Sequence, residues 1–174
     1  MKITLKKLKI AEHLSEETTA FTADVYADGT LIGYAKNDGQ GGSTFIHCEY
    51  KNKALFEAAN AYCEALPKEK YHDMEFAQDL ESIVDKLVEA ECNKKSLTQA
   101  KKKLERNMLK GLCFGTLEHY EIITWKGHTI ESILKVPNGA ATLINKIAIM
   151  GKDKLLNTNL PINIYEPQTT TTKG

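Results

Sequence analysis

The sequence of 174 residues has few of the features that identify a function at first sight. Aromatic residues make up 7% of it, and 23 Lys and Arg balance 23 Asp and Glu, so the formal net charge is zero. A neutral chain has no overall field that attracts nucleic acid or an anionic membrane. No apolar run approaches the ~18 residues that a membrane-spanning helix needs. What is left is an ordinary globular composition, with 42% hydrophobic and 26% charged residues.

Cysteine is also sparse, and none of the four cysteines belongs to a CxxC pair. Scattered thiols, together with an amino terminus that lacks a continuous apolar segment, predict a reduced, cytoplasmic protein. The sequence has no zinc-type ligand spacing and no GxSxG or HExxH motif, so we expect no cofactor, no metal and no enzyme activity. Cys113 lies near His119 and His128, but nothing specifies a third group to orient a base. A buried hydrophobic role for Cys113 is the simpler interpretation.

The first 50 residues have the patterns of β-structure. Apolar and polar residues alternate in residues 3–10, 21–26 and 31–36, as in half-buried strands. Lys6-Lys7 interrupts the first alternation and predicts a bulge. Asp28-Gly29 predicts a tight hairpin turn, because Gly adopts the positive φ that such a turn requires. With a fourth run at residues 43–50, these patterns predict an antiparallel meander.

Helical periodicity follows the strands. Apolar residues from Leu55 to Leu66 recur at helical spacing and end at Pro67. A longer helix is expected over residues 73–91, capped by Asp73, and a third from the capping-box sequence at Ser96 to Gly111. The short Cys92-Asn93 link between these two predicts an antiparallel helical hairpin over residues 73–110, with the apolar stripe around Leu80 packed against Leu97.

The expected fold class is therefore α+β: an N-terminal antiparallel β-meander packed by helices, followed by a helical hairpin and a mixed C-terminal segment. In that segment we expect strands at residues 120–125 and 155–160 and helices at 130–134 and 140–148. A single domain is expected over residues 1–165, with a flexible, threonine-rich tail at 166–174. The core is expected to draw on Ile3, Leu5, Phe21, Val25, Leu55, Ala59, Leu80, Ile83, Leu87, Ile122, Leu143, Ile144 and Ile147.

The two helices of the predicted hairpin have opposed charges. Residues 75–91 carry six acids against one lysine, and residues 94–110 carry seven bases against one glutamate. In a hairpin these charges would partly neutralise each other, and the alternative is two solvated faces. The second segment offers a surface that could follow nucleic-acid phosphates, although it has no interleaved aromatic residue. Its candidate residues are Lys101, Lys102, Lys103 and Arg106.

A glycine-rich loop at residues 37–44 is the most distinctive local feature. Backbone N–H groups in such a loop can bind an anion such as phosphate. The loop lacks the lysine of a P-loop and leads into a strand, so a plain hairpin connection is the alternative. Replacement of Gly41 and Gly42 by Val is expected to abolish binding and to cost little stability, because loop tips make few packed contacts. The candidate ligand- or partner-binding residues are Lys36, Asn37, Gly39, Gly41, Gly42, Ser43 and Thr44.

Two resemblances bear on function. The hairpin FTADVYADGTLIGYAK, the next strand and the alanine-rich KNKALFEAANAYCEAL resemble, over residues 20–66, the β-β-β-α order of double-stranded-RNA-binding domains. The leading helix of that family is missing, and Asn52 separates Lys51 from Lys53 where the family has paired lysines. In general style the short, neutral chain is similar to accessory proteins of phages and mobile elements. That likeness implies an inhibitor or sequestering protein of a host defence system, which needs a binding surface and no chemistry.

The sequence thus predicts a non-enzymatic binding protein whose target is a protein partner or a small anionic ligand. No membrane partner is expected, and homo-oligomer formation stays open. The alternative is a nucleic-acid-binding protein that uses the basic helix over residues 94–110.

Overall fold

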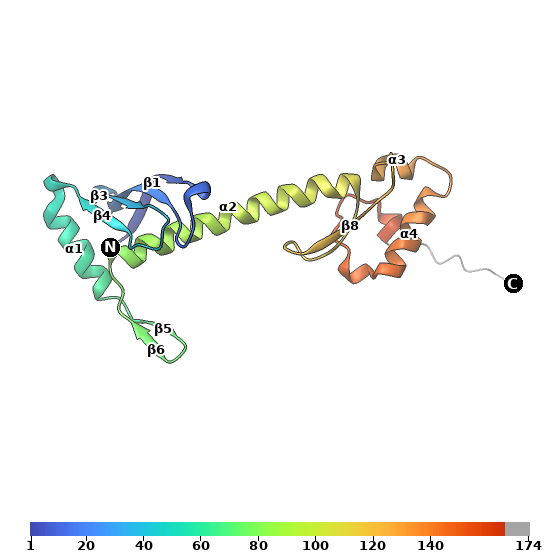
Figure 1. Ribbon diagram of the computed structural model, residues 1–174. Helices are drawn as coiled ribbons and strands as arrows, with labels where there is room; N and C mark the ends of the chain where they lie inside the picture. The colour runs from blue at the N-terminus through green and yellow to red at the C-terminus, as the bar shows by residue number, and fades with distance from the viewer. Residues whose placement is uncertain (166–174) are drawn as a thin grey trace. The chain divides into compact units, whose positions relative to one another are not determined.

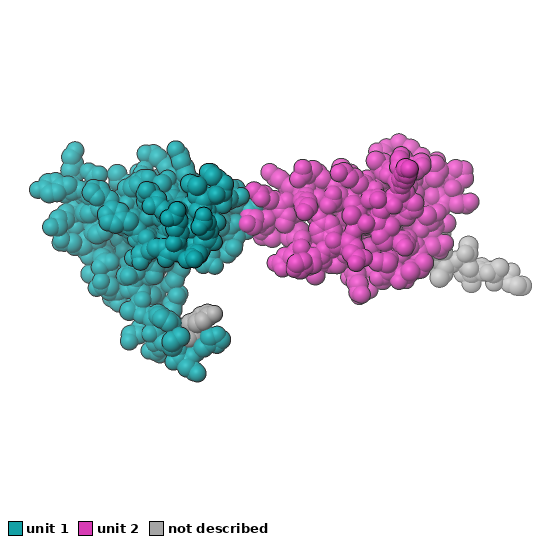
Figure 2. All heavy atoms as spheres, in the orientation of Figure 1, with its two compact units in different colours: residues 1–95 teal, residues 96–174 magenta. Residues whose placement is uncertain are grey.

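The computed structural model describes residues 1–165, and the tail expected at residues 166–174 lies outside this range. The fold is α+β, as expected, with a four-stranded antiparallel meander, one long helix, small hairpins and carboxy-terminal helices. The chain divides into two units, unit 1 (residues 1–95) and unit 2 (residues 96–174), where the sequence predicts a single domain (Figure 2).

Unit 1 is built on a sheet with the strand order β1-β2-β3-β4 (Figure 1). Its strands are β1 (Ile3–Ile10), β2 (Phe21–Ala27), β3 (Thr30–Asn37) and β4 (Phe45–Cys48). The predicted bulge is confirmed, because the β1–β2 register shifts between Lys6 and Lys9. The predicted turn is confirmed as well: Asp28 and Gly29 have φ values of 46° and 84°, in the left-handed region.

Helices cover one face of this sheet. α1 (Lys53–Glu64) and the first turns of α2 (Leu80–Lys110) share a core with the strands (Figure 1). Leu80, Val84 and Val88 recur every four residues, so they lie on one side of α2, and all three are buried. The side chains of β2 alternate between this core and the other face, as the period-2 pattern predicts. The buried core of unit 1 consists of Phe21, Ala23, Val25, Ala27, Ile32, Ala35, Ala59, Cys63, Leu80, Val84 and Val88.

A small hairpin precedes α2 where the sequence predicts the start of a helix. β5 (Glu69–Tyr71) and β6 (Met74–Phe76) pair antiparallel. The helix begins later because Asp79, and not Asp73, caps it. The Asp79 carboxylate accepts from the Ser82 N–H at 2.7 Å, and the Ser82 hydroxyl accepts from the Asp79 N–H at 2.9 Å. The 3-10 turns η1 (Glu12–Leu14) and η2 (Tyr50–Asn52) precede β2 and α1.

α2 is one uninterrupted helix of 31 residues, so the predicted helical hairpin is wrong. Cys92 and Asn93 lie inside the helix, and Ser96 is an interior residue rather than a cap. Residues 89–99 contain neither glycine nor proline, so nothing breaks the backbone hydrogen bonding, and a capping-box sequence does not by itself end the preceding helix. Leu97, which was expected to pack against the stripe around Leu80, is 48% exposed.

Unit 2 contains the end of α2 and a second core. The elements after α2 are β7 (Gly111–Gly115), β8 (Tyr120–Thr124), α3 (Ile130–Leu134), α4 (Gly139–Met150), η3 (Lys152–Lys154) and α5 (Ile162–Tyr165). β7 pairs antiparallel with β8. The core is formed by Leu112, Phe114, Ile130, Ile133, Leu143, Ile147, Leu160 and Ile164.

Two further expectations in unit 2 are wrong. Ile122 is exposed, because its neighbour Ile123 packs against the core and successive strand residues point to opposite faces. Residues 155–160 are not a strand. Leu155 alone forms a bridge, with Phe114, and the chain then turns to bury Asn157.

Asn157 completes the end of α2. Its side-chain amide donates to the carbonyl oxygens of Met108 and Gly111 at 3.3 and 3.0 Å, and its Oδ1 accepts from the Cys113 N–H at 2.7 Å. Asn159 donates to the Met108 carbonyl at 3.0 Å. Carbonyl groups in the last turn of a helix have no partner within the helix, so these two asparagines satisfy them from a distant part of the chain.

The continuity of α2 at Asn93 is directly testable. Asn93 is exposed, so a substitution there changes little except the backbone. We expect Asn93→Pro to destabilise the protein by about 3 kcal/mol or more and to lower the helical far-UV circular dichroism, because proline removes an interior helix hydrogen bond. Asn93→Ala is the matched control and is expected to stabilise slightly. A hairpin turn at Cys92-Asn93 would instead tolerate the proline without loss of helix.

Candidate functional site

Asn37 is buried at the start of the glycine-rich loop and organises it. Its Oδ1 accepts from the Thr18 hydroxyl at 2.9 Å and from the Gly39 N–H at 2.8 Å. Its amide donates to the Gly42 carbonyl at 3.0 Å and to the Thr44 hydroxyl at 3.1 Å. A single buried side chain therefore closes the loop on itself, and each of its polar atoms is used inside the protein.

The glycines of the loop have unequal roles. Gly39 and Gly41 have φ values of 86° and 83°, whereas Gly42 has an ordinary φ and open space around it. A Cβ on Gly39 would lie 2.4 Å from the Leu14 carbonyl oxygen. The Gly39 carbonyl oxygen accepts from the backbone N–H groups of Glu16, Glu17 and Thr18. The expectation that Gly41 and Gly42 can be replaced at little cost therefore fits Gly42 and is wrong for Gly41, whose positive φ disfavours other residues. Gly39, in addition, is a packed position.

Thr44 ties the end of the loop to α2. Its N–H donates to the Glu81 carboxylate at 2.9 Å, and its hydroxyl donates to the Asp85 carboxylate at 2.6 Å. The pKa of Asp85 is raised, chiefly because its carboxyl is partly buried, and the nearby Glu81 and Asp79 raise it further, while the Thr44 hydrogen bond opposes the shift.

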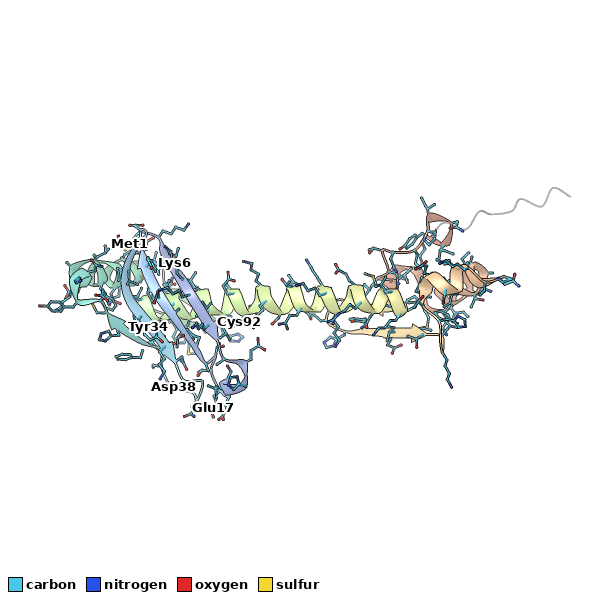
Figure 3. The ribbon with its side chains drawn as sticks, turned by 90° about the horizontal axis from the view of Figure 1, so that it is seen from above. Met1, Lys6, Glu17, Tyr34, Asp38 and Cys92 are labelled. Carbon is cyan, nitrogen blue, oxygen red and sulfur yellow. The ribbon has the colours of Figure 1, made fainter. Side chains whose placement is uncertain are left out.

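A groove of about 400 Å³ lies beside the loop, against α2. Asp85 and Glu89 contribute negative charge to its wall, and the one lysine there, Lys86, is already paired with Glu69 at 2.7 Å. Lys36 is paired with Asp38 at 2.8 Å. Figure 3 shows that Asp38 and Glu17 lie at the same end of the sheet.

This arrangement does not favour an anion at the loop. The N–H groups of Gly39, Gly41 and Thr44 already donate to protein oxygens, the second of them to the Thr18 hydroxyl at 3.3 Å. Carboxylates surround the position that a phosphate would need, and like charges repel. The structure brings the predicted loop residues together, but it gives them partners of their own, with Ser43 exposed at the surface.

Five of the eight basic residues of α2 lie in its last third. At 100° per residue, Lys102, Lys103, Arg106 and Lys110 fall within an arc of about 100°, and the stretch from Gln99 to Lys110 is about 16 Å long. All four are exposed, and among the described residues none of them forms an ion pair with an acid. We call Lys102, Lys103, Arg106 and Lys110 the basic face of α2.

Lys101 does not belong to this face. It lies on the other flank of the helix, on the side of Glu105, which is four residues further on. Three of the four residues that the sequence singles out for phosphate contacts therefore lie together, and the structure adds Lys110 to them. The i, i+4, i+8 spacing of Lys102, Arg106 and Lys110 is the sequence signal for this stripe.

The neutral chain conceals a separation of charge. Unit 1 carries 12 Lys and Arg against 17 Asp and Glu, and unit 2 carries 11 against 6. Unit 1 therefore has a net charge of −5 and unit 2 of +5. Because α2 is continuous, the acidic helix that was expected to fold back along the basic segment is not its hairpin partner.

The face of the sheet opposite the helices has residues that the sequence analysis missed. On this face Tyr34 lies across from His47, and Lys36 lies across from Phe45. Phe45 is 67% exposed and Tyr34 43%. In Figure 3 the strands lie in front of α2 and carry Lys6 and Tyr34. The sequence contains a signal for this exposed pair. Tyr34 alternates with Ala35 and Phe45 with Ile46, and strand alternation then places the aromatic side chains on the side away from the core.

The thiols and titratable clusters offer little chemistry. Burial raises the pKa of Cys113 and of Cys63, which disfavours the nucleophilic thiolate form. No group of three or more His, Cys, Asp or Glu in residues 1–165 is placed to hold a metal ion. Over the same part of the chain, none of the helices combines the length and the apolar character that crossing a membrane requires.

Comparison of this chain with protein-family models, with curated proteins and with solved structures finds no match.

The unequal roles of the loop glycines can be separated by two substitutions. We expect Gly39→Ala to lower the free energy of unfolding by at least about 2 kcal/mol, because the new Cβ meets backbone and the positive φ disfavours alanine. Gly42→Ala is the matched control and should leave stability nearly unchanged. Urea unfolding followed by circular dichroism measures both. Equal stabilities for the two variants would contradict the packed role of Gly39.

The raised pKa of Asp85 predicts a pH effect. The folded state holds the Asp85 proton to a higher pH than the unfolded state, so this residue lowers stability as the pH rises above its ordinary pKa of 3.8. We expect Asp85→Asn, which keeps an acceptor for Thr44, to be at least as stable as the wild type at pH 7. Its advantage should disappear on acidification below pH ~4.

Asp85→Ala is the control for that experiment. It removes the acceptor as well as the charge, so the Thr44 hydroxyl loses its partner and stability should fall. Thermal unfolding across the pH range compares the three proteins. An Asp85→Asn variant that is clearly less stable than the wild type at pH 7 would show that the charge itself is needed.

Proposed function

We propose that this chain is a non-enzymatic nucleic-acid-binding protein that contacts phosphate groups through the basic face of α2. The observation that carries the proposal is the exposure of Lys102, Lys103, Arg106 and Lys110 on one side of a continuous helix, without acidic partners among the described residues. Lysine and arginine side chains that line a helix in this way neutralise phosphates and release the counterions bound to them.

The distribution of charge supports this proposal. The net charge of zero argued against nucleic acid in the sequence analysis, but it is the sum of an acidic unit 1 and a basic unit 2. The local field at a surface depends on the nearby charges, and those of distant groups are screened beyond about 10 Å at 0.1 M salt. The four neighbouring cations of the basic face, and not the net charge of the whole chain, are therefore the charges that matter there.

The sequence analysis favours a protein partner or a small anionic ligand, and of these two the anion at the glycine-rich loop has less support. The loop N–H groups described above already have protein acceptors, and the Glu81 and Asp85 carboxylates lie where an anion would be repelled. The sequestering role that the likeness to phage accessory proteins implies stays a hypothesis, and the basic face would be the surface on which it depends.

A salt titration tests the proposed function. With four phosphate contacts, log K for a duplex is expected to fall linearly with log salt concentration, with a slope of about −3.6. Replacing Lys102 and Arg106 by Ala should weaken binding for all sequences and reduce the magnitude of this slope by about 2. Fluorescence anisotropy of labelled oligonucleotides, with the full chain, measures both quantities.

Lys51→Ala combined with Lys68→Ala is the control for the salt titration. Both lysines are exposed in unit 1, and the double substitution changes the net charge by the same amount. It should leave the slope unchanged if the basic face of α2 makes the contacts. Binding that is absent at low salt, or that responds equally to the two double variants, would refute the proposal.

A further inference from the structure

We propose that the open face of the sheet in unit 1 stacks the unpaired bases of a nucleic acid, so that single strands are the preferred substrate class. This inference rests on the proposed function and adds a second surface to it. Aromatic and basic side chains lie on the face of the β1–β4 sheet that the helices leave uncovered.

Three ring-bearing side chains, Tyr34, Phe45 and His47, lie together at the β3–β4 side of the face. Tyr34 is directly opposite His47, and Phe45 is the diagonal neighbour of Tyr34 on the next strand. Opposite side chains on one face are about 5 Å apart and diagonal ones about 7–8 Å, so the three rings form one cluster. Phe45 is 67% exposed, so packing in the core of unit 1 does not explain a phenylalanine at this position.

The basic side chains lie at the other side of the same face. The register places Lys6, Asp24, Tyr34 and His47 in one row across the four strands, and Lys9, Thr22, Lys36 and Phe45 in the next. Both rows therefore begin with a lysine on β1 and end with an aromatic residue on β4.

Asp24 is the one acid among the eight residues of these two rows. Asp24 is paired with Lys7 at 2.9 Å, which leaves the charges of Lys6 and Lys9 in excess on the β1 side. The Lys6 amino group lies 4.1 Å above the centre of the Tyr26 ring, which holds this cation on the surface of the sheet. Lys36 is paired with Asp38 at 2.8 Å, so Lys6 and Lys9 supply the excess positive charge of this face.

The aromatic cluster and the lysines together indicate which class of ligand fits this face. Aromatic rings stack on the faces of bases, and those faces are accessible in a single strand but covered in a duplex. The neighbouring lysines then meet the phosphates. The centre of a protein–protein interface, in contrast, is depleted of lysine, and here Lys6, Lys9 and Lys36 share one face with the aromatic residues. The face is therefore complementary to a single-stranded nucleic acid rather than to a protein.

The test measures anisotropy of the full chain with a labelled oligothymidine and with a duplex of the same length. Phe45→Leu keeps an apolar strand residue without a ring, and Tyr34→Ala removes the second ring. We expect each to weaken single-strand binding by about 5- to 150-fold, the range for loss of one stacked base, and to leave duplex binding unchanged. Tyr34→Phe keeps the ring and should bind as the wild type does. Tyr62→Ala, on α1, is the control for loss of an exposed tyrosine.

The outcomes separate the two proposals. If the sheet variants bind the single strand as the wild type does, or lose both ligands equally, the stacking surface is refuted while the basic face of α2 stands. If Phe45→Leu lowers single-strand binding but the Lys102 and Arg106 replacements change nothing, the proposed role of α2 is refuted and the sheet stands. A wild-type chain that binds neither oligonucleotide at low salt refutes both.

Discussion

The unbroken hydrogen bonding of α2 from Leu80 to Lys110 is the constraint on which the rest of the structure depends. One helix supplies Leu80, Val84 and Val88 to the core of unit 1 and Met108 to the buried part of unit 2. Its middle, from Asn93 to Gln99, is exposed, so packing does not hold that segment helical. This segment stays helical because it contains no glycine or proline and because each of the two cores buries part of the helix near one of its ends.

Polar side chains complete both ends of α2. At the start, the adjacent Asp79 caps the first turn, and Glu81 and Asp85 of the helix accept the hydrogen bonds of Thr44 from the glycine-rich loop. At the end, Asn157 and Asn159, from a distant part of the chain, donate to the Met108 carbonyl. Asn37 closes the glycine-rich loop in the same manner, with a buried amide that uses its donors and its acceptor. In each unit a buried asparagine converts an irregular segment into a defined one, because an unsatisfied polar group would be costly there.

The continuity of α2 also decides how charge is displayed. An acidic helix folded back along a basic one would have hidden both charges. A continuous helix leaves acids near its start and the basic face near its end, and the neutral composition becomes a unit of net charge −5 and a unit of +5. The proposed phosphate-binding surface is a consequence of this continuity. The proposed stacking surface has a different origin: α1 and α2 pack on one side of the sheet, which leaves Tyr34 and Phe45 on the other.

The sequence by itself determined the elements whose signals are local. Alternation specified the meander, Asp28-Gly29 its turn, and the lysine pair its bulge, because strand period and turn conformation depend on neighbouring residues. The basic residues Lys102, Lys103 and Arg106 were visible as well. The tertiary structure alone decided that Cys92-Asn93 is not a turn and that Ile122 is exposed. It also decided that the N–H groups of Gly39, Gly41 and Thr44 in the glycine-rich loop donate to oxygens of the protein itself. Those outcomes depend on partners distant in sequence, such as Glu81 for Thr44 and Asn157 for Met108, and no local pattern encodes such partners.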